Sequence, residues 1–175
     1  INKRNRVKKR EKMPRKTLIK VFAVLAVLAI AFASFTSLGG KDRVPTELTA
    51  DEIKQIVADA IVPTGVGGPA PAEIKSEDIF VGNGTEILPT STLTVHYTLM
   101  QWSTGEILES SWSSGEPATF PLSGVITGWQ QGLPGAKVGG SRLLVIPPAL
   151  GYGLMAGHPL EKETLIFVVD IIAVS

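Results

Sequence analysis

The chain has 175 residues, enough for one ordinary domain and an extension, and its 44% hydrophobic content allows a buried core. It contains no cysteine, which excludes disulfides, thiolate metal sites and a cysteine nucleophile, and its two histidines lack the spacing of a zinc site. The formal net charge of +1 combines a basic start with an acidic remainder, because the chain carries −8 from residue 21 onward. An acidic body of this kind disfavours nucleic acid as a partner.

The N-terminal region 1–20 is strongly basic and precedes an apolar run. It holds ten of the 17 lysines and arginines, with Glu11 as its only acid. The apolar zone covers residues 21–38 and includes the small-x-small sequence Ala31-Phe32-Ala33. A basic stretch, a short apolar run and small residues are typical of a secretory signal peptide, which predicts that the rest of the chain is exported.

An uncleaved signal-anchor is the main alternative for the same residues. A helix over Leu18–Leu38 would roughly span the hydrocarbon core of a membrane. We therefore expect either a protein anchored in the cell membrane and facing outward, or a secreted or periplasmic protein after signal cleavage. The true start is open between Ile1 and Met13, which would begin a signal of more ordinary length. The basic residues could instead bind RNA or anionic lipid, but the apolar run that follows favours the targeting interpretation.

Residues 39–69 are predicted to be a linker that contains one short amphipathic helix. Thr49 and Glu52 have the spacing of a capping box, and apolar residues then recur at helical spacing over about residues 50–61. A helix this short must dock on something, for which its own domain or the membrane surface is expected and a partner protein is the alternative. The stretch 62–72 is rich in proline and glycine and reads as a spacer; it lacks a phosphate-binding pattern, and no cofactor is expected.

From residue 70 to residue 175 the pattern changes to short strands and turns. Residues 92–100 alternate, which places Tyr97 on the core side and His96 on the outer side, where a surface or edge histidine is predicted. The apolar runs 142–146 and 165–174 are rich in β-branched residues and predict central strands.

One helix is predicted among these strands, over residues 125–133, with Ile126, Trp129 and Leu133 on one face. The predicted fold is therefore α+β: a twisted antiparallel sheet wrapped around one short α-helix. The 17-residue loop 147–163 joins two central strands and contains Gly151-Tyr152-Gly153. A long loop of this kind predicts a functional lid.

Five segments of this domain resemble the FKBP-type peptidyl-prolyl isomerases, the tacrolimus-binding immunophilins. In chain order they are VHYTLM, GEILESS, PATFPLSGVITGWQQGL, KVGGSRLLVIPPALGYG and TLIFVVDI, and together they span about residues 70–175. The resemblance implies an FKBP-like fold and isomerisation of X-Pro bonds in proline-containing polypeptide clients. It also implies binding of tacrolimus- or rapamycin-type macrolides, without a metal or a cofactor.

Rotation about a peptide bond meets a barrier of about 18–20 kcal/mol because the C–N bond has double-bond character. No proton or covalent bond has to move, so a dry, aromatic-lined site that favours the less polar, twisted amide is sufficient. By resemblance, Trp129 would form the floor under the proline ring, with Tyr97, Phe120 and Phe167 as walls and Val125 and Ile126 at the rim. The Ile126 amide and the Tyr152 hydroxyl would each bind a substrate carbonyl. By pattern alone, the same aromatic residues are expected in the core of any sheet-helix domain.

The chain departs from the family pattern at three places. Leu108-Glu109 stands where the family usually has Phe-Asp, Ala118 stands where many relatives have an aromatic residue, and Leu160 replaces the usual Ile-Pro-Pro of the lid tip. These changes predict weaker isomerase activity than that of a standard member.

Two other function classes compete with isomerisation. A binding module or chaperone could grip proline-containing segments in the same site without useful turnover. A hydrolase is disfavoured, because the chain has no G-x-S-x-G and neither histidine has a recognisable triad setting.

Overall fold

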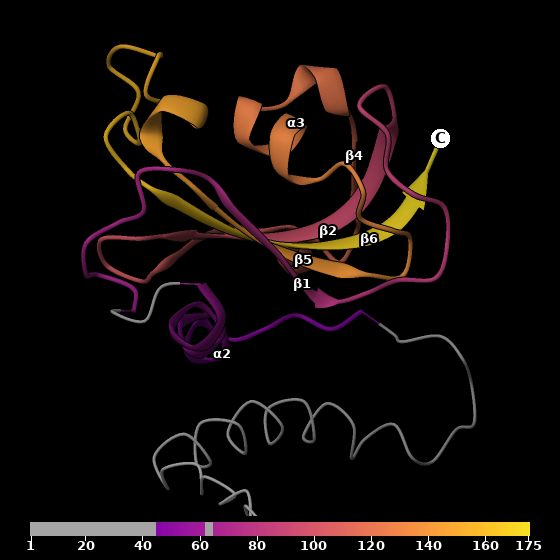
Figure 1. Cartoon of the computed structure of the whole chain (residues 1–175), viewed down its shortest axis with the longest axis horizontal. Helices are drawn as coiled ribbons and strands as arrows, with labels where there is room; N and C mark the ends of the chain where they lie inside the picture. Colours follow the sequence, from indigo (N-terminus) through magenta and orange to yellow (C-terminus); the bar gives the residue numbers. More distant parts are fainter. Residues whose placement is uncertain (1–44, 62–64) are drawn as a thin grey trace, which may run out of the picture. The chain divides into compact units, whose positions relative to one another are not determined.

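A six-stranded antiparallel sheet is the framework of the domain (Figure 1). The structure is a computed structural model that describes residues 45–61 and 65–175. The strands lie in the order β1-β5-β6-β2-β3, and β4 also pairs with β2. Their bounds are β1 (Lys75–Phe80), β2 (Thr92–Gln101), β3 (Ile107–Ser110), β4 (Ala118–Pro121), β5 (Ser141–Ile146) and β6 (Leu165–Val174).

The short helix α3 (Thr127–Gly132) packs on the concave face of this sheet (Figure 1). Its residue Trp129 and its C-cap residue Leu133 join the cluster formed by one face of β2, β5 and β6. Two glycines allow this close packing, because a Cβ at Gly128 would lie 2.5 Å from Ile146 and one at Gly132 would lie 2.6 Å from Leu144. The predicted fold class, an antiparallel sheet wrapped around one short helix, is confirmed.

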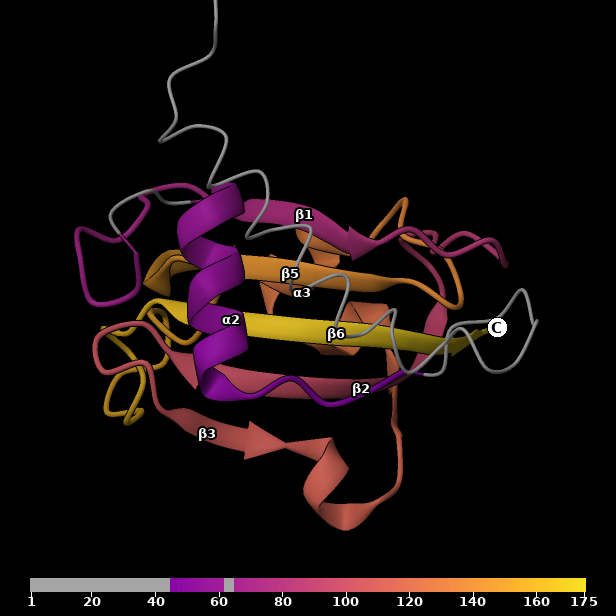
Figure 2. The same ribbon diagram turned by 90° about the horizontal axis from the view of Figure 1, so that it is seen from below.

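The second face of the sheet is covered by helix α2 (Ala50–Ile56), which continues as a π-helical turn, η1 (Val57–Ile61). The predicted capping box is present, because the Thr49 hydroxyl accepts from the Glu52 amide and the Glu52 carboxylate accepts from the Thr49 amide. Ile53 and Val57 are fully buried against apolar side chains of β2, β5 and β6. Figure 2 shows α2 lying across the strands on this convex face. The helix therefore docks on its own domain, one of the two expected sites.

His96 is not the surface or edge histidine that the sequence predicts. It does lie on the predicted side of β2, but it is only 9% exposed. The 3-10 turn η2 (Ser111–Ser114) follows β3 and stacks the Trp112 ring on the imidazole, with ring centroids 3.9 Å apart, while the Ser111 hydroxyl lies 3.0 Å from His96 Nδ1. The alternation of residues in β2 cannot predict that His96 is covered, because the covering residues belong to a segment 15 residues away.

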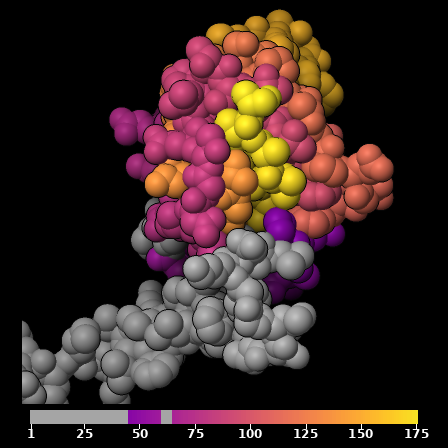
Figure 3. All heavy atoms as spheres, turned by 90° about the vertical axis from the view of Figure 1, so that its right-hand side faces the viewer, coloured from indigo at the N-terminus to yellow at the C-terminus, as the bar shows by residue number. Residues whose placement is uncertain are grey.

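Two further 3-10 turns lie near the site: η3 (Leu122–Gly124) precedes α3, and η4 (Pro148–Leu150) begins the predicted lid. The C-terminal end of β6 reaches the surface on the side of the molecule seen in Figure 3. Within residues 45–61 and 65–175, no helix has the length and hydropathy of a membrane span. The predicted signal peptide or anchor, residues 21–38, lies outside the described residues.

Candidate active site

Four aromatic rings meet on the concave face, with the Trp129 indole at the centre. The indole is only 4% exposed, and the Tyr97 ring is tilted against the rings of both Phe120 and Phe167 beside it. The centroids of these three rings lie, in that order, 5.8, 6.1 and 5.3 Å from that of Trp129, each in an edge-to-face arrangement. Edge-to-face contacts are a favoured geometry for aromatic pairs, so the indole is held firmly at the base of the group.

A half-buried apolar rim surrounds these rings. Val125 and Ile126 lie between η3 and α3, and Tyr152 and Leu160 come from the lid; all four pack against the same core. Val125 and Ile126 have extended backbones, with ψ of 176° and 149°, which explains why α3 begins at Thr127 rather than at the predicted residue 125. The sequence-predicted site residues of β2, β4, β6, α3 and the lid are thus brought together.

Two backbone groups of the rim differ in what they offer a ligand. The Gln130 side chain donates to the Val125 carbonyl, with Nε2 and O 2.8 Å apart, and so secures the segment before α3. In the part of the chain that the structure describes, the Ile126 amide donates to no other residue. The Trp129 Nε1 also has no partner among the described residues, although it is buried. The site therefore offers two donors that have no partner among the described residues, the Ile126 amide at its rim and the Trp129 indole N–H at its base.

The Tyr97 hydroxyl donates a hydrogen bond to the Glu109 carboxylate of β3. Glu109 thus spans the extra methylene that separates it from the aspartate of the family pattern. Burial, then the hydrogen bond and the negative charge of Glu109, raise the pKa of the Tyr97 phenol well above its usual range. Burial and the Glu109 charge also raise the pKa of Tyr152. Both phenols consequently stay protonated at neutral pH and remain hydrogen-bond donors.

These shifts predict how the site responds to alkaline pH. Because the folded pKa of each phenol is raised, the two groups add stability below the ordinary tyrosine pKa of about 10 and lose it as the pH rises further. Activity should therefore not fall through titration of Tyr97 or Tyr152 up to about pH 10. A spectrophotometric titration of the phenols, run beside the isomerase rate, checks this; ionisation of Tyr97 or Tyr152 in the folded chain below pH 10 would contradict it.

Leu108 is placed differently from the other predicted site residues. It lies on β3 beside Glu109, and its side chain is 41% exposed. Among the described residues, Leu108 is not one of those that pack around Trp129, so the structure does not bring this predicted site residue into the aromatic group.

One lid residue near the site was not predicted. The His158 imidazole stacks on the Tyr152 ring with centroids 4.1 Å apart, and its Nδ1 accepts from the Leu160 amide at 3.1 Å. Its position two residues before Leu160, in the same predicted lid as Tyr152, was the available signal. His158 fixes both lid residues that face the site.

Across the described residues, no group of three or more histidine, aspartate or glutamate side chains is placed to hold a metal ion. A buried indole, three more rings, an apolar rim and a few donors instead define a class of protein that binds an apolar ring and its flanking backbone.

Comparison with known proteins identifies the family. The model of the FKBP-type peptidyl-prolyl cis-trans isomerases matches residues 84–172, and the chain belongs to this family. It is 49% identical over 107 residues to a "Probable FK506-binding protein" of Corynebacterium glutamicum, covering 61% of this chain and 91% of that protein. An FK506-binding protein of Streptomyces anulatus is 44% identical over 113 residues, covering 62% and 91%. The chain is thus an FKBP-type peptidyl-prolyl cis-trans isomerase.

A solved structure agrees with this assignment. The crystal structure of AtFKBP13 matches with a TM-score of 0.51 and 30% identity, and the match covers 61% of this chain and 96% of that one. The fold and the resemblance expected from the sequence are therefore both confirmed.

Proposed function

We propose that this isomerase acts on X-Pro bonds of exported polypeptides outside the cytoplasmic membrane, with the proline ring seated on Trp129. The main observation in support of this proposal is the buried Trp129 indole, which Tyr97, Phe120 and Phe167 contact edge-to-face. Apart from the indole N–H, these rings offer no polar partner to a planar, charge-separated amide. They therefore favour the twisted amide, whose carbonyl is less polar.

The flanking chain would be held by groups around this floor. The unpaired Ile126 amide is the donor for one substrate carbonyl, and the protonated Tyr152 hydroxyl is the donor for a second. Glu109 orients the Tyr97 hydroxyl, and Val125 and Leu160 line the edges where residues beside the proline would lie. Leu108, next to Glu109 on β3, would contact the substrate from the exposed side. Two fixed donors hold the chain on either side of the bond while the apolar floor receives the ring.

A relaxation assay tests this proposal. The cis-to-trans relaxation of a short X-Pro peptide is followed by a protease-free method, with and without tacrolimus, using the full chain. Drug-sensitive acceleration is expected, since relatives are named for binding FK506. A folded chain that gives no acceleration at any concentration would refute the catalytic proposal.

Leu108→Phe is expected to raise kcat/KM severalfold. The larger ring would cover the exposed edge beside Glu109 and exclude water from the reacting amide, and about 1.4 kcal/mol of added transition-state preference is worth tenfold. Glu109→Asp is the companion change. Because Glu109 already reaches Tyr97, it should give no gain unless combined with Leu108→Phe. No gain from the single or the double variant would show that the departures at 108 and 109 do not limit the rate.

A binding module without useful turnover is the second candidate, and the lid favours it. Leu154 is 87% exposed beside Tyr152, and Met155 is also exposed, so the lid presents apolar surface that could grip an unfolded segment. The two candidates differ at Trp129: its replacement removes catalysis, whereas suppression of aggregation through other surfaces survives it.

The export proposal is supported by the basic residues 1–20 and the apolar residues 21–38. N-terminal sequencing of the membrane-associated and released protein tests it. A start near Ser34 in all material would rule out the anchor, and recovery of the intact chain from the cytoplasm alone would refute export.

A further inference from the structure

The C-terminal end of helix α3 accepts hydrogen bonds from side chains of the sheet. This six-residue helix carries Trp129, and it is too short to be stable alone. The carbonyls of its last turn need donors from elsewhere, as at the C-terminus of any helix. The carbonyl of Gly132 ends the helix, and those of the C-cap residue Leu133 and of Pro134 follow it; the Leu133 carbonyl also accepts from the Ala136 amide at 3.0 Å.

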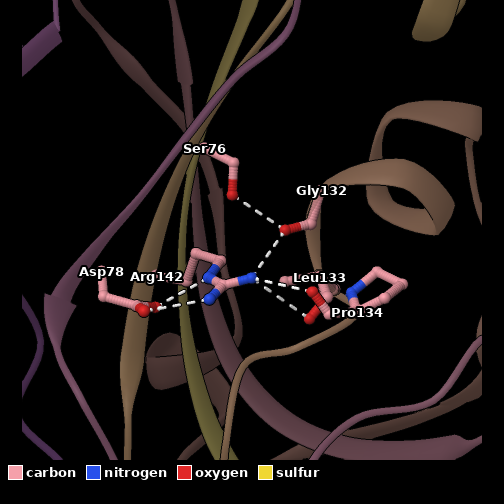
Figure 4. A network of polar contacts seen from close by, with 6 residues as sticks. All are labelled: Ser76, Asp78, Gly132, Leu133, Pro134 and Arg142. Atoms are coloured by element: carbon pink, nitrogen blue, oxygen red, sulfur yellow. Dashed lines mark hydrogen bonds and ion pairs between the residues drawn. The ribbon is translucent and has the colours of Figure 1, made fainter.

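One side chain of the sheet reaches all three carbonyls (Figure 4). Arg142 Nη1 lies 3.0 Å from the Gly132 carbonyl, 3.4 Å from that of Leu133 and 3.1 Å from that of Pro134. The Ser76 hydroxyl also donates to the Gly132 carbonyl at 2.8 Å. A permanent positive charge at this end of the helix is also favourable for the helix dipole.

The edge strand β1 fixes the direction of the guanidinium. Asp78 lies directly opposite Arg142 in the β1–β5 pairing and accepts from Nε at 2.7 Å and from Nη2 at 3.0 Å. Figure 4 shows the fork, with the carboxylate on one side and the helix end on the other. The Arg142 side chain is only 12% exposed and that of Asp78 is 30% exposed, so the guanidinium is largely sheltered from solvent and the carboxylate only partly. A two-point bond to a carboxylate fixes a guanidinium plane in a way that a lysine ammonium cannot reproduce.

The contact is one helical turn from the site. The Leu133 carbonyl accepts from Arg142, and the Leu133 amide donates to the Trp129 carbonyl at 3.0 Å. The indole has no hydrogen bond of its own among the described residues, so its place depends on ring packing and on the backbone of α3. A shift of the helix end would therefore move the floor of the site.

We propose that Arg142, oriented by Asp78, is a positioning residue for isomerisation: it clamps the C-terminal end of α3 and so sets the height and tilt of Trp129. The inference rests on the proposed role of Trp129 as the floor under the proline ring. Misplacement of a reacting group by about 1 Å can lower a rate about 100-fold, so a clamp remote from the substrate can matter to catalysis.

The test compares Arg142→Gln, Arg142→Lys and Asp78→Asn in the full chain with Ile53→Ala. Ile53 is buried on the opposite face of the sheet, so this control lowers stability without touching α3. Two quantities are measured under conditions where every variant is folded: kcat/KM for an X-Pro peptide, and hydrogen exchange of the Leu133 amide.

Arg142→Gln is expected to lower kcat/KM about tenfold and to speed Leu133 exchange, because the floor loosens while the sheet stays intact. Arg142→Lys and Asp78→Asn should fall between it and the parent, and Ile53→Ala should change neither quantity beyond its effect on global stability. Unchanged Leu133 exchange in Arg142→Gln would overturn the clamp, whatever the activity. Faster exchange with parental kcat/KM would overturn the link to catalysis. An inactive parent would instead refute the proposed function, with the exchange result still deciding the clamp.

Discussion

Replacing Trp129 with leucine is expected to lower kcat/KM for an X-Pro peptide about 100-fold while the domain stays folded, a loss of about 2.7 kcal/mol in transition-state stabilisation. Leucine keeps an apolar side chain at the base of the site, so it leaves a smaller cavity than alanine would. Replacing a buried tryptophan with alanine lowers the free energy of unfolding by about 3–5 kcal/mol. What leucine removes is the flat ring that Tyr97, Phe120 and Phe167 hold edge-to-face. Tacrolimus affinity should fall with the activity, because both depend on the same floor.

Trp102→Leu is the matched control. Trp102 is 3% exposed, close to the value for Trp129, but it belongs to the cluster on the convex face and donates from Nε1 to the Gly68 carbonyl at 2.9 Å. Its replacement should lower the free energy of unfolding by a similar amount and leave kcat/KM unchanged. Equal loss of activity in the two variants would mean that stability, and not the floor, explains the effect at Trp129.

The elements that follow a local period could be predicted from the sequence. Alternation in β2 placed Tyr97 towards the core, and the strand expected over residues 165–174 has those bounds in the structure. The helix expected over residues 125–133 is shorter at both ends: it begins at Thr127, because the backbone of Val125 and Ile126 is extended, and it ends at Gly132 with Leu133 as its C-cap. Edge strand β1 has mostly exposed and charged residues, so it carries no apolar period and went unassigned.

What depends on distant partners could not be predicted. His96 is covered by Trp112 through a turn that follows another strand. Arg142 reads as the polar start of an apolar strand, and its partner Asp78 lies 64 residues earlier, so nothing local indicates that the pair closes the end of α3. The roles of Trp129, Tyr97 and Tyr152 came from the family resemblance, because aromatic residues at these spacings would also suit an ordinary core; the structure adds that they surround one apolar floor. Their roles in catalysis remain predictions.

Removal of helix α2 is expected to destabilise the domain severely. Ile53 and Val57 are fully buried on the convex face, and burial of such side chains contributes about 1.5–3 kcal/mol each. Their loss alone, about 3–6 kcal/mol, is a large part of the 5–15 kcal/mol that stabilises a typical domain. It also uncovers Met100, Trp102 and Val168, a continuous apolar surface on the sheet. A fragment that starts at residue 70, the predicted domain boundary, should therefore unfold at much lower urea than residues 45–175, and should aggregate.

Urea unfolding of the two fragments measures this difference, and point variants in α2 separate helix docking from mere chain length. Ile53→Ala in residues 45–175 should lower the free energy of unfolding by about 2–5 kcal/mol, whereas Gln55→Ala, on the exposed side of the helix, should lower it by less than about 0.5 kcal/mol. Isomerase activity of the folded fraction should stay the same in each case, since α2 and Trp129 lie on opposite faces of the sheet. If residues 70–175 prove as stable as residues 45–175, then α2 contributes nothing to the domain, and the sheet's convex face must tolerate water despite its apolar side chains.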